Sequence, residues 1–392
     1  MSTLLINPSE RSILQNAGDR MPLGLLYIAK SLERHNEKVR VYDLNHDSEK
    51  QLFDDINRDK PELIGVSCLT SPLVNESRRL LHQLHSTFPQ IKLIVGGYHS
   101  TVKPGDFKDL AEVIPGEGEY AILGLKDEGL KGLTPARHLV KDSNYNLMMD
   151  GMRTATMITS RGCPNNCIFC GNLSHKVREH DLKDIESELE YIANHNYKAV
   201  YFLDDVFTIN KKRAITISEM CKDRGLKFRL TTRANYLTND LVSRLSQNGL
   251  DIVSMGVESG NPSILEAVGK NQTKQQIRDA VTMCHTNGVK TKGFYILGLP
   301  GETEKTAKQT IRFAEELRNL GMDYHDFYSL VCYPGTALYN DPSKYGIKIL
   351  THDYSKYLQV NKEGVAYPTC ETKDLKADRI YELLLEARRR LK

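Results

Sequence analysis

Three cysteines lie close together in one short stretch near the middle of the 392-residue chain. Cys163, Cys167 and Cys170 have the spacing C-x-x-x-C-x-x-C, and the apolar run at residues 156–158 before them predicts a strand. The Pro-Asn-Asn sequence at residues 164–166 predicts a loop, which allows three thiolates to converge on one point. Because iron–sulfur clusters are normally held by cysteine thiolates, the loop predicts a 4Fe–4S cluster with one iron left open.

Two other roles for these cysteines remain as alternatives. A structural zinc ion usually takes four ligands in two closely spaced pairs, and here His175 and His180 are single histidines. Inert thiols belong in a buried regular element, whereas this stretch is rich in turn residues. We therefore expect an iron–sulfur cluster rather than zinc.

The cysteine spacing, with the aromatic Phe169 directly before the last cysteine, resembles the signature of the radical S-adenosylmethionine (SAM) superfamily. The resemblance implies that the amino and carboxylate groups of SAM chelate the open iron. It also implies that an electron from the cluster cleaves SAM to methionine and a 5′-deoxyadenosyl radical, which abstracts hydrogen from an unactivated carbon. The cofactors supply this chemistry, while the protein orients them and excludes water.

The composition narrows the setting of this chemistry. The formal net charge is +3, which is too small to favour nucleic-acid binding. No signal-peptide pattern opens the sequence and no apolar run reaches transmembrane length. The other five cysteines lie apart and mostly in apolar segments, which is typical of reduced thiols in a cytoplasmic protein. These cysteines are Cys68, Cys221, Cys284, Cys332 and Cys370.

Residues 1–125 alternate short apolar runs with helical spacing, which predicts a doubly wound parallel sheet. A sheet of this kind binds ligands outside the carboxyl ends of its strands. We expect strands at residues 4–6, 39–42, 63–67, 91–95 and 113–114, and helices at residues 22–35, 48–57 and 72–88.

Polar and glycine residues follow these strands, and in their order they resemble the cobalamin-binding domain of one radical-SAM class. The resemblance implies a cobalamin site at the carboxyl edge of the sheet. Its expected residues are Ser67, Leu69, Thr70, Gly96, Gly97 and Glu117.

One departure from that class concerns the lower axial ligand of cobalamin. Domains that supply a histidine carry D-x-H-x-x-G after the second strand, whereas this chain has Asn45 at the histidine position of the motif that begins at Asp43. His46 is one residue out of register, so we expect it to be a loop histidine. Other proteins of the class lack the ligand histidine, so cobalamin remains expected, with a scaffold domain that binds no cobalamin as the alternative.

The βα alternation resumes after a connector at residues 126–153 and predicts a partial (β/α)₆ radical SAM barrel over residues 154–337. A C-terminal helical extension at residues 338–392 follows, with a helix expected at residues 374–391 that ends in three arginines. The expected barrel strands are residues 155–160, 199–203, 227–231, 252–256, 291–297 and 326–331, and the helices are residues 183–195, 211–224, 239–248, 274–287 and 303–319.

Residues at the barrel's strand ends resemble the SAM-binding positions of the same class. The resemblance implies that Phe169 lies beside the adenine, that Arg233 pairs with the methionyl carboxylate, and that Glu258 accepts from the ribose or amino group. Gly298 and Pro300 would let backbone approach the adenine. The structural alternatives are loop packing for Phe169, a salt bridge to Asp204 or Asp205 for Arg233, and a simple turn at residues 298–300. For Glu258 the alternative is a capping or ion-pair residue.

The function implied is a cobalamin-dependent radical SAM enzyme, with C-methylation of a small molecule or lipid as the leading reaction. Its cofactors would be a 4Fe–4S cluster, SAM and cobalamin, and its electron donor a flavodoxin or ferredoxin. The alternatives are a radical cyclisation, C–C coupling or rearrangement with a scaffold domain, and more remotely a non-enzymatic iron–sulfur or zinc protein. Methylthiolation is disfavoured, because only Cys68 is available in the N-terminal domain for a second cluster.

Overall fold

The computed structural model describes residues 2–11, 13, 18–126 and 129–391. The chain divides into two compact units. The N-terminal unit comprises Met1–Met148 and takes Asp353–Leu358 from the tail, and the C-terminal unit comprises Met149–His352 and Gln359–Lys392. Within the described residues, no helix has both the length and the apolar character needed to cross a membrane.

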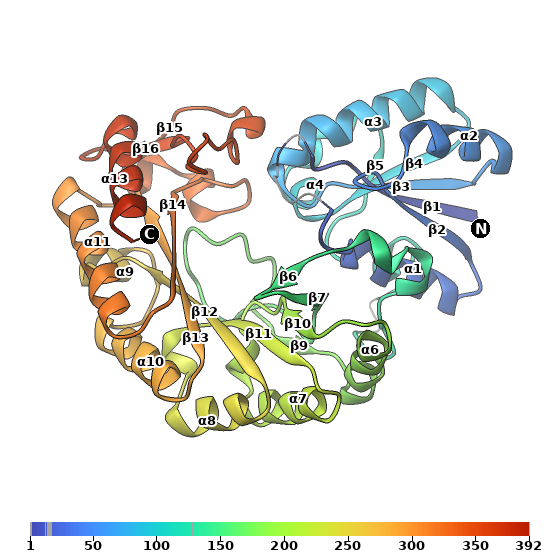
Figure 1. The fold of residues 1–392 in the computed structure, drawn as a ribbon. Coiled ribbons are helices and arrows are strands. Elements are labelled where there is room, and N and C mark those ends of the chain that lie inside the picture. Colours follow the sequence, from blue (N-terminus) through green and yellow to red (C-terminus); the bar gives the residue numbers. More distant parts are fainter. Residues whose placement is uncertain (1, 12, 14–17, 127–128, 392) are drawn as a thin grey trace. The chain divides into compact units, whose positions relative to one another are not determined.

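The N-terminal unit is built on one five-stranded parallel sheet with the order β2-β1-β3-β4-β5 (Figure 1). Each neighbouring pair of strands is parallel, so every connection crosses over, and the expected doubly wound topology is confirmed. The strands are β1 (Ser2–Asn7), β2 (Lys38–Asp43), β3 (Leu63–Ser67), β4 (Lys92–Gly96) and β5 (Glu112–Val113).

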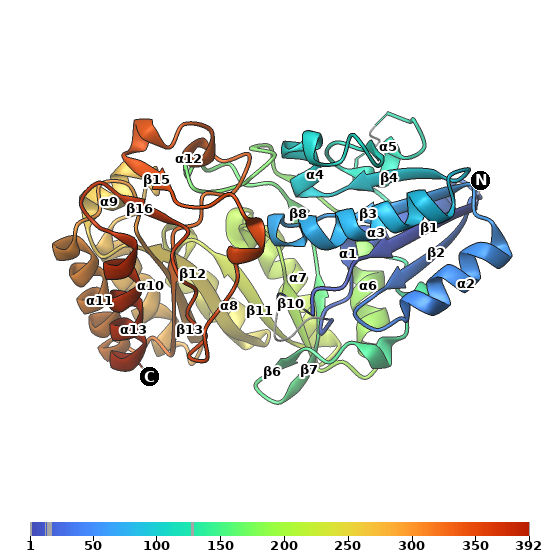
Figure 2. The ribbon, with the colours of Figure 1, turned by 90° about the horizontal axis from the view of Figure 1, so that it is seen from above.

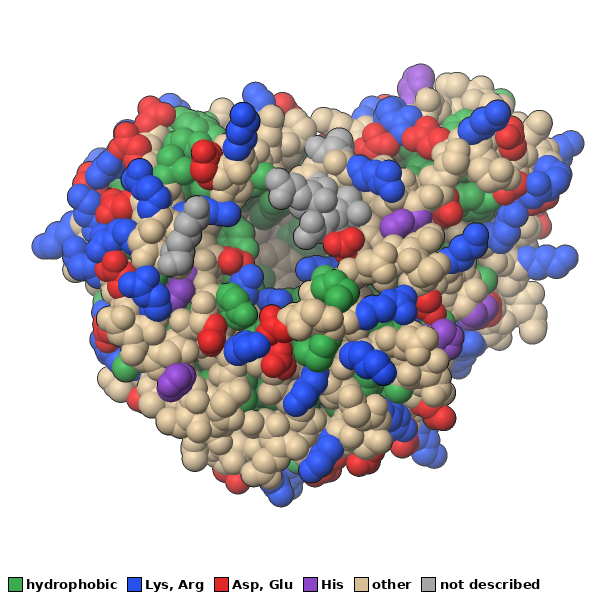
Figure 3. Space-filling model, in the orientation of Figure 1, with side chains coloured by type: hydrophobic (Ala, Val, Ile, Leu, Met, Phe, Trp, Pro, Cys, Tyr) green, Lys and Arg blue, Asp and Glu red, His purple; other side chains and the backbone are tan. Residues whose placement is uncertain are grey.

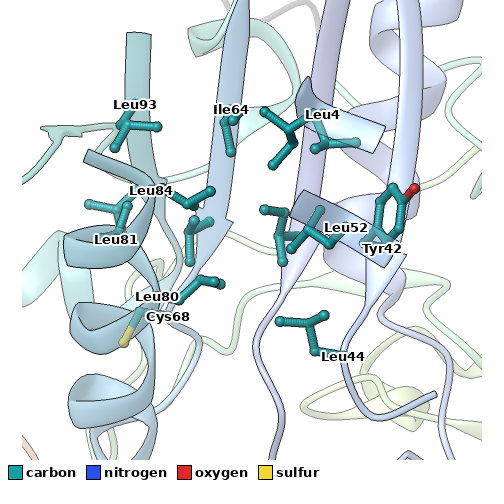
Figure 4. Packing of buried hydrophobic residues seen from close by; sticks show 14 of the residues in the cluster. Leu4, Tyr42, Leu44, Leu52, Ile64, Cys68, Leu80, Leu81, Leu84 and Leu93 are labelled. Carbon is teal, nitrogen blue, oxygen red and sulfur yellow. The ribbon is translucent and has the colours of Figure 1, made fainter. Parts of the chain in front are cut away.

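Helices cover both faces of this sheet. Helices α2 (Glu49–Asp59) and α3 (Val74–Thr87) contribute Leu52, Leu80 and Leu84 to a buried cluster with Leu4 and Ile64 of the strands, as Figure 4 shows. Helix α1 (Leu23–Arg34) contacts β1, β2 and the short α5 (Gly118–Ala121), and none of its residues joins that cluster. Because side chains alternate along a strand, α1 covers the opposite face.

The tail segment of the N-terminal unit was not anticipated from the sequence. Its 3-10 helix Tyr354–Lys356 packs against the 3-10 helix Ser71–Leu73, which directly follows β3. The Tyr354 ring lies edge-on to the His99 ring, with centroids 5.1 Å apart. Aromatic packing thus fixes this part of the tail near the carboxyl ends of β3 and β4.

The C-terminal unit contains a curved sheet with the order β14-β13-β12-β11-β10-β7-β6 (Figure 1). Strands β7 to β14 of this sheet are parallel neighbours, which confirms the partial barrel with six strands. These are β7 (Met152–Met157), β10 (Ala199–Phe202), β11 (Lys227–Thr232), β12 (Leu250–Glu258), β13 (Lys290–Leu297) and β14 (Tyr324–Ser329), with β6 (Met148–Met149) at the edge.

A helix follows each strand from β7 to β13 and packs on one face of the sheet. For α11, Thr303 caps the first turn through a reciprocal hydrogen-bond pair with Thr306, as expected where a loop enters a helix. Figure 2 shows α10, α11 and α13 together at one end of this unit. The helices are α6 (Leu182–Asn194), α7 (Lys211–Asp223), α8 (Asn239–Gln247), α10 (Lys274–Thr286) and α11 (Glu304–Asn319).

The tail closes the C-terminal unit with α13 (Ala377–Arg390), which confirms the expected helix. Its apolar side packs with Leu297 and Ile311 in one buried cluster. The basic end is engaged within the unit, because Arg390 pairs with Glu315 at 2.7 Å and Arg388 donates to the Gly364 carbonyl at 3.1 Å. On the face drawn in Figure 3, cationic and anionic side chains are interspersed, in keeping with the small net charge.

Candidate functional site

The cysteine loop leaves the sheet of the C-terminal unit directly after β7. A small antiparallel pair, β8 (Ser160–Arg161) with β9 (Arg178–Glu179), ties the two ends of the loop together. Gly162 has φ +94°, and a Cβ there would collide with the Lys176 carbonyl oxygen. Glycine is therefore required where the loop turns toward its cysteines.

Hydrogen bonds hold the first cysteine in place. The Cys163 amide donates to the Ser174 carbonyl at 3.1 Å, and the Asn172 side chain donates to the Cys163 carbonyl at 2.7 Å. Asn165 donates its amide to Cys163 Sγ at 3.2 Å. The loop backbone is thus fixed by its own residues, while its thiols remain partly exposed.

The other cysteines lie against the segment that follows α9 (Pro262–Ala267). The Ile168 amide donates to the Val268 carbonyl at 3.2 Å, and Cys167 Sγ lies 3.7 Å from the Gly269 carbonyl. A Cβ on Gly269, at φ +67°, would lie 2.9 Å from the Asn166 carbonyl oxygen. This close approach brings the next residue, Lys270, beside the cysteine loop.

The Cys170 thiol is held in its neutral form by its surroundings. Desolvation raises the pKa of Cys170, and the charges of Cys167, Asp205 and Cys163 add to this effect. Among the described residues, no trio of His, Cys, Asp or Glu side chains is grouped around a single metal ion. This holds for the three cysteines too, so both the cluster and the zinc role of the loop stay predictions.

Arg233 follows β11 and is 5% exposed. Its Nη1 lies 3.4 Å from Cys167 Sγ, whereas its buried Nε and Nη2 have no hydrogen-bond partner. The ion pair with Asp204 or Asp205 that was the structural alternative is absent from the described part of the chain. A buried guanidinium with two unmet donors beside Cys167 suits an anionic group, such as the carboxylate of SAM that the sequence predicts here.

Glu258 ends β12 and forms a buried ion pair. Its Oε1 lies 2.7 Å from Lys270 Nζ, and both side chains are less than a tenth exposed. Glu258 has φ +62°, a left-handed conformation that is rare for a residue other than glycine and that often marks a functional site. The ion-pair alternative for Glu258 is therefore present, and the ligand role predicted from the sequence stays a prediction.

Asp204 anchors the start of the cysteine loop. Its carboxylate accepts from the Thr159 amide at 2.8 Å, the Thr159 hydroxyl at 2.6 Å and the Ser160 hydroxyl at 2.6 Å. Burial raises the pKa of Asp204, and these donors oppose the shift. Asp204 thus joins the ends of β7 and β10 and fixes the direction in which the loop leaves the sheet.

The turn after β13 brings Gly298 and Pro300 to the same end of the sheet. Gly298 has φ +89°, and its amide donates at 2.5 Å to the carboxyl of Glu302, a fully buried residue. Burial raises the pKa of Glu302 to about 8. Phe169 packs against the apolar cluster that contains Leu299 and Cys332, so its packing role is present and its adenine role stays a prediction.

Lys270 and Glu302 were missed as site residues by sequence reasoning. Lys270 stands twelve positions after its partner Glu258, and only the fold brings the two together. Glu302 belongs to the glycine-rich run at residues 298–302, but the sequence gives no sign that its side chain folds back onto the Gly298 amide. The one sequence signal that could have pointed to Lys270 as a site residue is its place in a Gly-Lys pair directly after a helix.

In the N-terminal unit, the residues expected to bind cobalamin lie at the carboxyl ends of β3 and β4 and after β5. Leu69 and Thr70 are exposed, and Ser67 is half-buried. Gly97 has φ +110°, and a Cβ there would lie 2.6 Å from the Cys68 carbonyl oxygen. Glu117 is exposed just before α5. The backbone of two neighbouring loops is therefore brought close at the edge where such sheets bind ligands.

A buried histidine links these two loops. His99 Nδ1 shares a hydrogen bond of 2.9 Å with the Ser71 hydroxyl, and its Nε2 lies 2.8 Å from the Asp106 carboxylate. Burial lowers the pKa of His99, and the Asp106 carboxylate opposes this shift. The imidazole thereby holds the loop after β3 against the helix that begins at Tyr98.

The departure at the axial-ligand position has a structural role. Asn45 is buried, donates its side-chain amide to Asp43 at 2.8 Å, and accepts from the Glu10 amide at 2.8 Å. His46 Nε2 lies 2.7 Å from the Gly18 carbonyl, and its ring packs edge-on against Tyr145. Both side chains are thus engaged within the unit, as expected for a loop histidine.

Family models match both halves of the chain. The model of the radical SAM superfamily matches residues 157–314, and the model of the B12-binding domain matches residues 13–126. These matches include the cysteine loop in one case and the carboxyl edge of the N-terminal sheet in the other.

Similar proteins cover nearly the whole chain. An uncharacterized methyltransferase of Pyrococcus horikoshii, PH0819, is 30% identical over 98% of this chain and 90% of that protein. The anaerobic magnesium-protoporphyrin IX monomethyl ester cyclase of Rubrivivax gelatinosus is 26% identical over 91% of this chain and 72% of that protein. A structure of the radical SAM methyltransferase TsrM from Kitasatospora setae, with cobalamin and a 4Fe–4S cluster bound, has the same fold, with TM-score 0.75, 16% identity, and coverage of 100% and 89% of the two chains.

Proposed function

The chain belongs to the radical SAM superfamily and carries an N-terminal B12-binding domain, and from this premise we propose that it is an enzyme that transfers a methyl group to a carbon atom of its substrate. The observation that carries the proposal is the pairing of two sites in one chain: a cysteine loop with an unmet guanidinium beside it, and a glycine-lined sheet edge. The methyltransferase similar over nearly its full length supports methyl transfer over other radical reactions.

In this proposal Cys163, Cys167 and Cys170 hold the 4Fe–4S cluster. Arg233 binds the carboxylate of SAM, because its Nε and Nη2 lack partners in a buried position. Glu258 and Lys270 form a neutral pair that orients the polar part of SAM without adding net charge. Phe169, Gly298 and Pro300 enclose the adenine, with Glu302 fixing the turn.

The N-terminal unit would hold cobalamin over Ser67, Leu69, Thr70, Gly96, Gly97 and Glu117, without a histidine from the loop after β2. When bound, the cluster supplies the electron that cleaves SAM, and cobalamin carries the methyl group. The protein's part is to place these groups, exclude water and accept a small-molecule substrate and an electron donor such as flavodoxin or ferredoxin.

The proposal is tested by anaerobic reconstitution with iron, sulfide and hydroxocobalamin, followed by desalting and reduction in the presence of SAM. We expect about one cobalamin retained per chain, and formation of both 5′-deoxyadenosine and S-adenosylhomocysteine. Cys167→Ala should abolish 5′-deoxyadenosine formation. Cys221→Ala, which changes a buried thiol of α7, is the matched control and should retain it. Loss of cobalamin on desalting, with 5′-deoxyadenosine still formed, would contradict methyl transfer.

A second function is favoured by one observation, the similarity to the magnesium-protoporphyrin ester cyclase. It is a radical ring closure or coupling without methyl transfer. The same experiment separates the two, because ring closure predicts 5′-deoxyadenosine without S-adenosylhomocysteine.

A further inference from the structure

The face of the barrel sheet that carries no helices presents a defined set of side chains. Leu297 of β13 and Phe327 of β14 pack with α11 and α13, so their alternate neighbours point to the opposite, inner face. Strand registers pair Ser254 with Lys292 and Tyr201 with Arg229, which extends this face across the sheet. We call the following side chains the inner-face cluster: Tyr201, Arg229, Ser254, Lys292, Phe294, Asp326 and Tyr328.

One of the two cations in the inner-face cluster is already paired. Lys292 Nζ lies 2.5 Å from Asp326 Oδ2, and the Tyr328 hydroxyl donates to the same oxygen at 3.1 Å. The carboxylate of Asp326 is therefore committed to Lys292 and Tyr328. This group of three has no net charge at neutral pH.

Arg229 is the cation whose charge is not matched. Its Nε donates to the Ser254 hydroxyl at 3.1 Å, and its guanidinium carbon lies 4.4 Å from the centroid of the Tyr201 ring. Over the parts of the chain that the structure describes, no carboxylate forms an ion pair with Arg229. The buried Ser254 hydroxyl holds one edge of the guanidinium, and the Tyr201 ring lies against its face. The two Nη groups remain available to bind a ligand.

Apolar surface lies next to this guanidinium. The rings of Phe294 and Tyr328 have centroids 6.4 Å apart, and Tyr328 is 50% exposed. Ile252, on the same face, forms a small buried cluster with Met149 and Ala199.

We propose that the Nη groups of Arg229 bind an acidic group of the substrate, a carboxylate or a phosphate, while Phe294 and Tyr328 contact the apolar part of the same molecule. This inference rests on the proposed function, because it assigns the substrate to the inner face of the barrel. The substrate class is an amphipathic organic acid. A fixed arginine fork binds such a group in two parallel hydrogen bonds, which also orients the carbon to be attacked.

The test measures binding without turnover, so it is independent of methyl transfer. Indole-3-acetate and its neutral counterpart indole-3-acetamide are incubated with the reconstituted enzyme and SAM, and the unbound probe is quantified after ultrafiltration. The membrane retains the protein, so indole fluorescence in the filtrate comes from the probe alone. We expect the acid to bind about tenfold or more tightly than the amide.

Three variants complete the test. Arg229→Gln should weaken binding of the acid about tenfold and leave the amide unchanged, and Arg229→Lys should fall between. Arg224→Gln, directly after α7 and paired with Glu186, is the control and should change binding of neither probe. Stronger competition by phenyl phosphate than by benzoate would identify phosphate as the group bound, and the reverse a carboxylate. The proposal would be overturned if the acid and the amide bind equally well or if the acid does not bind. It would also be overturned if Arg229→Gln binds the acid as tightly as the wild type does.

Discussion

Arg233 shows how one side chain distinguishes a ligand site from packing. A buried guanidinium with two unmet donors is costly to a folded protein unless a ligand supplies the acceptors. We predict that Arg233→Gln retains the iron–sulfur absorbance but binds SAM about tenfold to a hundredfold more weakly. Equilibrium dialysis with labelled SAM measures this. Arg244→Gln, exposed on α8, should bind SAM as the wild type does, and an equal loss in both variants would contradict the assignment.

In the N-terminal unit, a substitution of Gly97 tests the expected cobalamin site in the same way. With φ +110° and the Cys68 carbonyl 2.6 Å from a Cβ, alanine forces the loop after β4 away from the loop after β3. We predict that Gly97→Ala lowers the free energy of unfolding by about 1–3 kcal/mol and loses hydroxocobalamin on desalting. Gly24→Ala, in α1 with nothing near its Cβ, should instead stabilise by about 0.5–1 kcal/mol and retain cobalamin. Retention of cobalamin by both would remove Gly97 from the site.

At the scale of one element, the turn after β13 depends on a buried carboxyl. Burial raises the pKa of Glu302 to about 8 from its ordinary 4.5, so the folded state favours the protonated form. Between these two values the unfolded chain binds fewer protons, so this group's contribution to stability is complete below pH 4.5 and is lost as the pH rises to 8. Deprotonation of Glu302 in this range should lower the free energy of unfolding by roughly 2 kcal/mol or more.

Glu302→Gln removes this titration while keeping an oxygen that accepts from the Gly298 amide. We predict that the variant is more stable than the wild type above pH 8 and that its stability no longer falls between pH 4.5 and 8. Urea denaturation at a series of pH values measures both. Glu266→Gln, exposed on α9, should follow the wild type, and a parallel fall in Glu302→Gln would show that another group titrates.

Elements with strong local patterns were predicted well from the sequence. All six expected barrel strands are present, because β-forming residues between helical stretches mark each of them in the sequence. The cysteine loop was equally readable, since its spacing is local. The 3-10 helix at Tyr354–Lys356 was not, because its place beside Ser71–Leu73 depends on a contact between residues far apart in sequence. Nor does the sequence show that Lys270 reaches Glu258 or that Arg229 rests on Tyr201.

At the scale of the whole molecule, the two units have separate cores and separate expected ligands. A ligand that binds only the folded state stabilises it by RT ln(1 + [L]/Kd), which is about 2.7 kcal/mol at a hundredfold excess over Kd. Amide exchange in the unit that binds should then slow by up to about a hundredfold. Exchange elsewhere need not change, because each unit opens from its own core.

We therefore predict that hydroxocobalamin slows hydrogen exchange in peptides covering residues 63–73 and 92–102, and that SAM added to the reconstituted enzyme slows it at residues 160–170 and 256–270. Mass spectrometry of the full chain measures both at once. Gly97→Ala is the control, since it should lose the first effect and keep the second. Protection by hydroxocobalamin confined to the C-terminal peptides would contradict the cobalamin assignment and favour a scaffold role for the N-terminal sheet.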